Sequence, residues 1–350
     1  MLKSAFTIRS IRPRESRCRR IAIACVAVMW CFLAGAAEEA APSVERWGLF
    51  ELALDGPDDG NPFVDVRFSA EFTNGVRSVE VPGFYDGGGV YRVRFSPDTE
   101  GAWRYRTASN RWELTGKAGG FWVRPASAGN HGPVRVHNTY HFAYADGTPF
   151  KQIGTTIYNW IDAPDDIQEE TLRTLAAAPF NKARMLITQQ PKSYRGTFAP
   201  PRWPFQGSPP HDWDFARFDP AFFRHYEKRI AQLRDLGIEA DLILFNPYGK
   251  WGFETMDRSA DERYVRYVVA RFGAFRNVWW SLANEYDFLR TKTEQDWDFL
   301  GRLVREADPH DRLRSIHNGR LIYNHNRPWV THASIQNGAA VEESGRAQIY

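Results

Sequence analysis

Short apolar segments alternate with helical patterns from residue 127 to the end of the chain, and this alternation constrains the fold more than any other feature. Strands that are buried on both faces and joined by helices form a parallel sheet. We count six strand–helix steps, and no glycine-rich phosphate turn follows the first strand, so a (β/α)8 TIM barrel is favoured over an open sheet. Because the chain ends at Tyr350, we expect this barrel to be truncated after about strand six. The predicted strands lie near 153–157, 182–187, 239–245, 277–284, 312–317 and 330–336.

Helices between these strands have recognisable ends. Asp219 and Pro220 open one of them as N-cap and first-turn proline. Thr293 and Asp296 form a pair similar to a capping box at the start of another. A third helix is predicted over 260–272, where a glycine follows.

Residues 43–126 show a different pattern, in which apolar and polar residues alternate with period two. Val66, Phe68, Ala70 and Phe72, for example, are separated by polar residues. Such segments are typical of strands with one face in a core and the other in water, and turn signals such as YDGGG separate them. They predict an antiparallel β-sandwich of the immunoglobulin type. A hairpin is predicted after it, at VRVHNTYHFAYADGTPF.

The first 36 residues predict a secretory signal peptide. A segment rich in arginine is followed by the apolar run IAIACVAVMWCFLAGAA, which ends in the small residues at 34–36. A membrane anchor is the alternative, but the run is short for a span. The arginine pair at 19–20 hints at a twin-arginine signal, and Cys25 hints at a lipoprotein site. We therefore expect a secreted or periplasmic protein, free of the membrane after cleavage.

Removal of this segment changes the charge and the cysteine content. It holds seven of the 45 basic and one of the 42 acidic residues, so 38 basic and 41 acidic residues and a net charge of −3 are left. A nucleic-acid partner is therefore not indicated. The cysteines, at 18, 25 and 31, all lie in the segment, so neither disulfides nor thiolate chemistry is expected afterwards. No pattern indicates an oligomeric state.

Polar side chains gather where the predicted strands end. Reactive groups of TIM barrels sit at the C-terminal ends of the strands, so these side chains should share one rim. The stretch NVWWSLANEYD, at 277–287, shows the pattern best, because a strand fit for burial runs into Asn284 and Glu285. The other residues at predicted strand ends are Thr155, Thr156, Tyr158, Trp160, Arg184, Asn246, His317, Asn318, His332 and Gln336.

These strand ends resemble those of a known group of enzymes. Asn181-Lys-Ala-Arg184, Asn284-Glu285 and a histidine after strand five are similar to the retaining (β/α)8 glycoside hydrolases of clan A. More closely, the chain after the signal resembles an uncharacterised bacterial family of predicted glycosidases that begin with a sandwich domain of unknown function. The shared motifs are NPF and GFYDG in the sandwich, followed by GTTxYxW, NEYD, SIHNG and WxTHxSIQ.

The resemblance implies hydrolysis of an O-glycosidic bond by double displacement. Glu285 would act as general acid and then as base, and Asn284 would hydrogen-bond the sugar 2-hydroxyl. Arg184 would keep the nucleophilic carboxylate ionised. That nucleophile is expected after strand seven, about 5–5.5 Å from Glu285 in a retaining enzyme, and so beyond residue 350. Further substrate contacts would come from Tyr158, Trp160, Asn246, His317, His332 and Gln336, and no metal or other cofactor is implied.

Three of these residues also have an ordinary structural interpretation. Glu285 could pair with a neighbouring arginine, and Arg184 could anchor a structural ion pair. His317 could be a hydrogen-bonded core histidine. The tryptophans at 279–280 are predicted to be core residues.

A loop of some thirty residues, at 189–218, follows predicted strand two. Structureless loops of this size are usually functional or disordered, and the aromatic content of this one argues against disorder. We predict that it walls the substrate cleft and that Trp203 or Trp213 stacks on sugar rings. Tyr248 and Trp251, in the loop NPYGKWGFE, could act in the same way.

The predicted function is that of a secreted glycoside hydrolase acting on a plant or algal polysaccharide or oligosaccharide. A non-catalytic carbohydrate-binding protein is the second interpretation, because the strand of the nucleophile is missing. An adhesion protein is the third, although adhesion does not require a polar rim. Fold does not determine substrate, so the sugar, the linkage and the choice between exo and endo action are left open.

Overall fold

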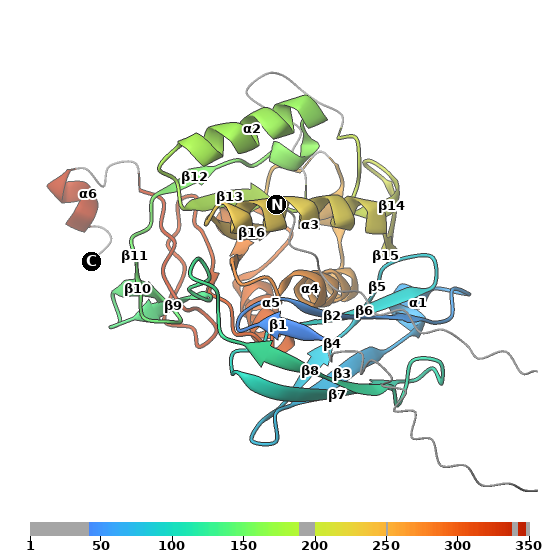
Figure 1. Ribbon diagram of the computed structural model, residues 1–350. Coiled ribbons are helices and arrows are strands. Elements are labelled where there is room, and N and C mark those ends of the chain that lie inside the picture. The colour runs from blue at the N-terminus through green and yellow to red at the C-terminus, as the bar shows by residue number, and fades with distance from the viewer. Residues whose placement is uncertain (1–41, 189–199, 250, 338–341, 348–350) are drawn as a thin grey trace, which may run out of the picture.

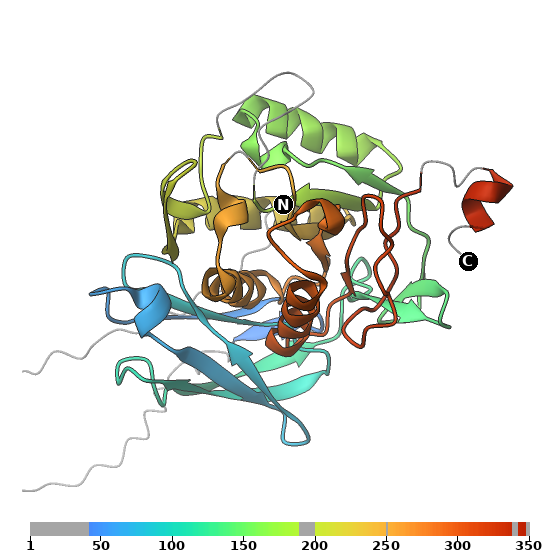
Figure 2. The same ribbon diagram turned by 180° about the vertical axis from the view of Figure 1, so that it is seen from behind.

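The computed structural model describes residues 42–188, 200–249, 251–337 and 342–347. A β-sandwich and an α/β body lie side by side in this part of the chain (Figures 1 and 2). The predicted signal peptide falls outside the described residues, so export stays a prediction. Within those residues, no helix is long and apolar enough to cross a membrane.

Two sheets packed face to face make up the N-terminal body. One has the strand order β1-β8-β7-β3-β4 and the other β2-β6-β5, and their strands pair antiparallel except for β1 with β8. Alternate residues of facing strands, such as Phe50 and Phe72, are buried between the sheets. A sheet-rich N-terminal domain is confirmed, while its immunoglobulin type stays a prediction. The elements are β1 Ser43–Glu45, β2 Phe50–Asp55, α1 Pro62–Asp65, β3 Phe68–Thr73, β4 Ser78–Pro82, β5 Phe84–Tyr85, β6 Val90–Phe95, β7 Gly101–Ser109 and β8 Ala118–Arg124.

A parallel sheet forms the centre of the α/β body. Its strands pair in chain order, as β12-β13-β16-β17-β18. The described strands form an open sheet rather than a closed barrel, although their order is the one that the TIM-barrel prediction requires. The strands are β12 Gly154–Thr156, β13 Lys182–Leu186, β16 Glu239–Phe245, β17 Val278–Ala283 and β18 Arg314–Ser315.

The predicted sixth strand, 330–336, is wrong for the described residues. An isolated parallel bridge joins Ser334 to His317, and no regular ladder continues from it there. The reason is that the segment bonds irregularly: the amide of Thr331 donates to the Arg314 carbonyl, and the amide of Gln336 donates to a side-chain oxygen of Asn318. The segment nevertheless lies beside β18, as a sixth strand would.

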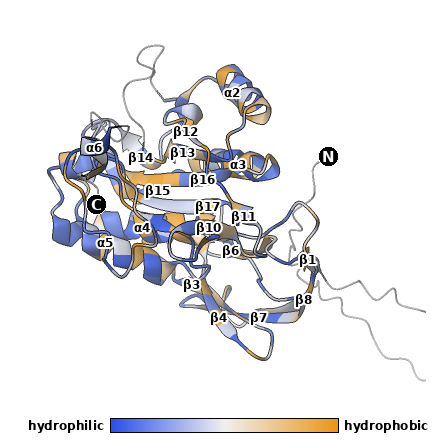
Figure 3. Cartoon of the chain, turned by 90° about the vertical axis from the view of Figure 1, so that its left-hand side faces the viewer, coloured by the Kyte–Doolittle hydropathy of each residue, from blue (hydrophilic) through white to orange (hydrophobic). Residues whose placement is uncertain are grey.

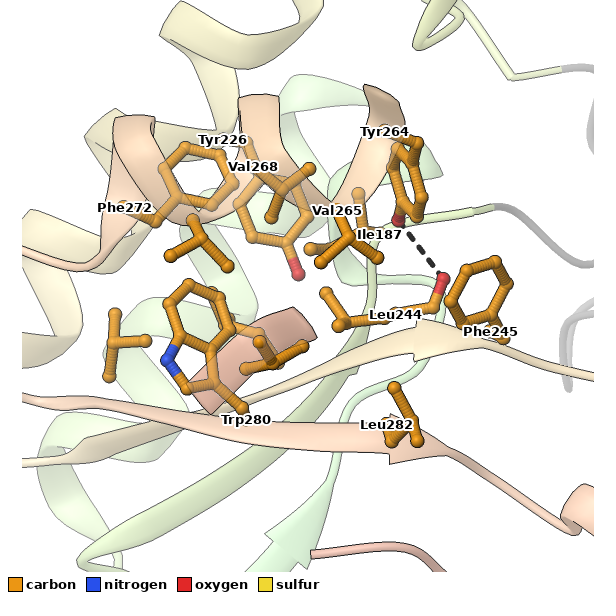
Figure 4. Packing of buried hydrophobic residues seen from close by; sticks show 14 of the residues in the cluster. Ile187, Tyr226, Leu244, Phe245, Tyr264, Val265, Val268, Phe272, Trp280 and Leu282 are labelled. Carbon is orange, nitrogen blue, oxygen red and sulfur yellow. Dashed lines mark hydrogen bonds between the residues drawn. The ribbon is translucent and has the colours of Figure 1, made fainter. Parts of the chain in front are cut away.

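Helices cover one face of the parallel sheet. Trp280 and Leu282 on the strands pack against Tyr226, Val265 and other side chains of the helices, and the Tyr264 hydroxyl donates to the Leu244 carbonyl at 3.0 Å (Figure 4). Helical turns on the outside of this layer mix hydrophilic and hydrophobic residues (Figure 3), as expected for helices with one buried face. The helices are α2 Asp165–Ala177, α3 Pro220–Asp235, α4 Arg258–Phe272, α5 Glu294–Ala307 and α6 Glu343–Ala347, with 3₁₀ turns at Trp160–Asp162, Phe253–Thr255 and Tyr286–Phe288.

The predicted helix starts agree with the structure in two cases and shift in the third. The Asp219 carboxylate accepts from the amide of Ala221, and Thr293 forms the expected capping box. α4 begins two residues earlier than predicted, because Asp257 caps it by accepting from the amide of Ala260. Side-chain caps of this kind offset the unpaired amides of a first turn.

Two smaller sheets flank the parallel sheet. The predicted hairpin at 134–150 is confirmed and gains an additional short strand, as β9 Val134–His137, β10 His141–Tyr144 and β11 Pro149–Phe150. The loop at 189–218 is not structureless where it is described, since it folds back as the hairpin β14 Phe205–Ser208 and β15 Asp212–Phe218. Residues 189–199 of this loop lie outside the described residues.

Charged side chains join the sandwich to the α/β body in a buried network. Arg94 of the sandwich donates to both carboxylate oxygens of Glu227 on α3, at 2.6 and 3.1 Å. Arg271 on α4 bonds to Asp86 of the sandwich at 2.7 Å and also to Glu227. Arginines and carboxylates therefore come from both sides, and each arginine has a carboxylate partner from the other body.

His310 adds a pH-sensitive contact to this interface. Its Nε2 accepts from the backbone amide of Ser96 at 3.1 Å, and its ring lies 5.9 Å from that of Phe95. Burial lowers the pKa of His310 below the ordinary value of 6.5; the carboxylate of Asp308 acts in the opposite direction, but burial together with the positive charge of Arg312 prevails. The ring is therefore neutral in the folded protein.

We expect the free energy of unfolding to fall as the pH drops below about 6.5, where the unfolded chain binds a proton at this position and the folded protein does not. One such histidine contributes up to about 1.4 kcal/mol per pH unit. Urea denaturation between pH 7.5 and 5.5 should show a shallower loss for His310→Gln, which cannot titrate but can still accept from Ser96. Equal slopes for the two proteins would contradict this.

Candidate active site

The candidate site lies where the strands of the parallel sheet end. Loops after β12, β16 and β17 and the segments after β18 meet there around Glu285, which is half-buried. Two chains of hydrogen bonds reach its carboxylate, one at each oxygen. In the described part of the chain, no salt bridge joins Glu285 to a basic side chain, so the alternative interpretation, in which it pairs with an arginine, is not seen.

The first chain of hydrogen bonds starts at Tyr158. Its hydroxyl donates to Oδ1 of Asn284 at 3.0 Å, and Nδ2 of Asn284 donates to the hydroxyl of Tyr248. The Tyr248 hydroxyl in turn donates to Oε2 of Glu285 at 2.8 Å. Burial raises the pKa of Tyr248 above its usual range, and the bond to Glu285 raises it further, so this hydroxyl keeps its proton.

The second chain runs from His317. Its Nε2 lies 3.3 Å from Oε1 of Gln336, and Nε2 of Gln336 donates to Oε1 of Glu285 at 3.2 Å. Burial lowers the pKa of His317, and the charge of Arg184 lowers it further. A neutral ring must then donate from Nε2 to the Gln336 oxygen, while Nδ1 accepts from the Ser334 hydroxyl at 3.0 Å.

The backbone at Glu285 is held in an unusual conformation. Its φ of 49° and ψ of 53° lie in the left-handed region, which residues with a side chain rarely adopt. Contacts on the far side hold the turn in place: the Tyr286 amide donates to the His317 carbonyl, and the Asp287 carboxylate accepts the amides of residues 319–321. Such over-determined strain is concentrated at functional sites in proteins, which is consistent with a functional turn here.

Arg184 lies on the face of the parallel sheet that the helices do not cover, which we call the inner face. It donates to the Ser281 hydroxyl at 3.2 Å and forms a salt bridge with Asp241 at 3.4 Å, and Lys182 pairs with the same carboxylate at 2.9 Å. Burial tends to raise the pKa of Asp241, but the charges of Lys182 and Arg184 outweigh it and lower the value. The structural ion pair of Arg184 is therefore present.

Arg184 was predicted from its strand, but the other charged residues of this inner face, Lys182, Glu239 and Asp241, were missed by reasoning from strand ends alone. Lys182, Arg184, Glu239 and Asp241 alternate with apolar residues in strands that we took to be buried on both faces. Period-two charge in two neighbouring parallel strands is the signal that could have found them. Glu239, at the start of β16, accepts from the indole of Trp279 at 2.7 Å, and burial raises its pKa to about 7.

Two predicted contact residues lie away from the rim and are corrected. Trp160 is buried between α2 and α3 with its indole bonded to the Gln168 carbonyl, because the 3₁₀ turn at 160–162 directs it into the core. His332 packs against Trp279 and Phe142, at the start rather than the end of its segment. The core prediction for Trp279 and Trp280 is confirmed.

Asn246 supports the loop that carries Tyr248. Its Nδ2 donates to the carbonyl and hydroxyl of Thr188 at 2.9 and 3.0 Å, and its Oδ1 accepts from the Tyr248 amide at 3.1 Å. Both ends of the Asn246 amide are thereby engaged within the protein. Asn284 is 1% exposed and has both ends of its amide engaged as well, so neither asparagine presents a free amide to solvent.

Trp203 and Trp213 belong to a half-buried aromatic cluster. Their rings lie 5.4 Å apart, that of Trp203 lies 5.1 Å from Trp251, and that of Trp213 stacks on Phe253 at 5.5 Å. The Trp213 indole also donates to the Trp251 carbonyl. The cluster joins the long loop after β13 to the loop after β16, which also carries Tyr248.

Two parts of the chain match family models. Residues 43–110 match a domain of unknown function (DUF5060), and residues 136–349 match the apiosidase-like catalytic domain. No curated protein matches the chain.

Solved structures that match the chain include proteins described as glycoside hydrolases. A predicted glycoside hydrolase from Bacteroides vulgatus ATCC 8482 shares 44% identity with a TM-score of 0.83, and the match covers 88% of this chain and 62% of that one. A glycoside hydrolase family 5 protein from the same strain shares 17% identity with a TM-score of 0.44, covering 57% of this chain and 43% of that one. The exo-beta-1,4-mannosidase Op5Man5 from Opitutaceae bacterium strain TAV5 shares 15% with a TM-score of 0.44, covering 58% and 40%.

The chain thus spans about 62% of the length of the relative with 44% identity. The apiosidase-like model, in contrast, matches more than half of this chain, from residue 136 to residue 349. This protein belongs to the apiosidase-like catalytic-domain family.

Proposed function

We propose that this protein is a secreted glycoside hydrolase that cleaves O-glycosidic bonds in a plant or algal polysaccharide or oligosaccharide. Glu285 acts as the general acid and then as the base of a retaining mechanism. The observation that carries the proposal is the Glu285 carboxylate, which lies at the ends of the parallel strands and is hydrogen-bonded by Tyr248 and Gln336. Family membership adds apiosides to the substrates to be tried first.

The geometry favours catalysis over passive binding. A carboxylate that only stabilised the turn would need neither the strained backbone of Glu285 nor the donors Tyr248 and Gln336 that converge on its two oxygens. We assign no nucleophile, because the inner-face carboxylates do not suit the role. Asp241 forms salt bridges with Lys182 and Arg184. On the neighbouring strand it pairs with Trp279, which comes six residues before Glu285, so Asp241 lies well below the end of the strands.

The test is a panel of aryl glycosides and plant-cell-wall oligosaccharides, which includes apiosides, incubated with the purified protein. Release of reducing sugar, with the anomer retained in the first product seen by NMR, supports the proposal. Inversion of the anomer would overturn the retaining mechanism. Binding by calorimetry without any release would favour the carbohydrate-binding interpretation instead.

The long loop gives a separate prediction. If Trp203 and Trp213 border the cleft, replacing both by alanine should raise the Kd for an oligosaccharide roughly fivefold to tenfold, the usual effect of truncating a large contact residue. The measurement is calorimetric titration of the wild type and the double variant. Trp112→Ala, at a side chain 76% exposed on the sandwich, is the matched control and should leave the Kd unchanged. Unchanged affinity in the double variant would remove these tryptophans from the binding site.

A further inference from the structure

We propose that Tyr248 is a positioning residue that fixes Oε2 of Glu285, so that Oε1 is the oxygen that exchanges a proton with the substrate. This inference rests on the proposed function, and it names which atom of the acid/base residue does the work. It follows from the direction of each hydrogen bond around the carboxylate, not from the presence of the carboxylate alone.

In the series of hydrogen bonds from Tyr158 to Glu285, the chemical groups decide which atom donates and which accepts. Oδ1 of Asn284 can only accept, so the Tyr158 hydroxyl donates to it, and Nδ2 of Asn284 can only donate, so the Tyr248 hydroxyl receives it. Tyr248 then has one proton, and the carboxylate oxygen 2.8 Å away is its acceptor. Because the pKa of Tyr248 is raised, this proton stays on the phenol. Oε2 is therefore an acceptor throughout.

A proton on Oε2 would break this arrangement. The Tyr248 hydroxyl would have to accept from both Asn284 and Glu285, and its own proton would lose its acceptor. A proton on Oε1 leaves the bonds of Asn284 and Tyr248 in place and affects only the bond from Gln336, whose side chain is exposed and whose amide oxygen stays bonded to His317. An unpaired hydroxyl proton on the half-buried Tyr248 is costly, so the proton of Glu285 is better placed on Oε1.

The reaction then balances at Oε1. In the first step the Oε1–H bond breaks and the proton passes to the glycosidic oxygen. The bond from that oxygen to the anomeric carbon breaks at the same time, and the nucleophilic carboxylate forms an ester with this carbon. In the second step Oε1 takes a proton from water, whose oxygen bonds to the anomeric carbon as the ester breaks. The proton of Tyr248 does not move in either step.

The test compares Tyr248→Phe with the wild type. Loss of the anchor lets the carboxylate rotate, and misplacement on this scale lowers kcat by about 10- to 100-fold, with little change in KM. The alkaline limb of the pH–rate profile should also move to higher pH, since a donor to the ionised carboxylate is lost. Tyr140→Phe, at a side chain 89% exposed, is the control and should match the wild type in both readouts.

A purely structural role for Tyr248 would lower the melting temperature and leave the alkaline limb in place, which would overturn the proposal. A second measurement does not need turnover: the carboxyl carbon of Glu285, labelled with ¹³C and assigned with Glu285→Gln, should titrate at higher pH in Tyr248→Phe. An unmoved resonance would also overturn it. If the wild type hydrolyses nothing, the proposed function fails while this titration still decides whether Tyr248 holds the carboxylate.

Discussion

Replacing Glu285 by glutamine is expected to lower kcat/KM for an aryl glycoside by about 10²- to 10⁴-fold, the range that a positioned acid or base contributes. Glutamine has nearly the same shape and can still accept the hydrogen bond of Tyr248, so the fold should be unaffected. What it cannot do is give a proton to the leaving oxygen. The loss should therefore be largest for poor leaving groups and smaller for nitrophenolates, which depart without protonation.

The measurement is steady-state kinetics over a series of leaving groups, with circular dichroism to verify folding. Glu343→Gln is the matched control, because Glu343 is an exposed glutamate on α6, and it should behave as the wild type. If Glu285→Gln hydrolysed poor leaving groups at the wild-type rate, Glu285 would not be the acid, and the proposed mechanism would have to be abandoned.

Replacing Arg271 by alanine is expected to reduce the free energy of unfolding by about 3–5 kcal/mol, the usual cost of removing one partner of a buried ion pair. The Arg271 side chain is fully buried, bonds to Asp86 and Glu227, and donates to the Tyr267 hydroxyl at 2.8 Å. Burial alone raises the pKa of Asp86, but the charges and hydrogen bonds of Arg271 and Arg92 together outweigh it and keep the value low. Without Arg271, both carboxylates stay buried with less positive charge near them.

Urea denaturation of Arg271→Ala and of Arg266→Ala would test this. Arg266 is an exposed arginine on the same helix, paired with Glu262, and such surface pairs contribute about 0–1 kcal/mol. A loss below about 1 kcal/mol for Arg271→Ala would show that water or other charges replace it, and that the network adds little to the joining of the two bodies.

Much of the fold could be predicted from local patterns. The period-two segments gave the sandwich strands, and the strand–helix alternation gave the order of the parallel sheet, with β16 at its predicted bounds. These patterns succeed because a strand or an amphipathic helix exposes its buried face at fixed intervals along the chain. The segment at 330–336 failed because its amides bond to Arg314 and Asn318, which no interval along the chain reveals.

The site was predicted in outline, without its connections. Glu285, Asn284, Tyr158, His317 and Gln336 do meet, because the ends of parallel strands lie at one edge of a sheet. Their roles in the hydrogen-bond network depend on which rotamer each adopts and which oxygen each reaches. Trp160 shows the limit of the approach, since it follows a strand end like the others and still turns into the core.

From its sequence alone, this protein can be assigned a sandwich followed by a parallel α/β sheet, and a carboxylate at residue 285 where a buried strand ends. Only the tertiary structure decided that Tyr248 holds that carboxylate, that Arg184 pairs with Asp241, and that Arg271 joins the two bodies. The reason is physical: periodicity and caps act between neighbours in sequence. Tyr158 and Asn284, by contrast, are 126 residues apart and meet only after the strands have settled into register.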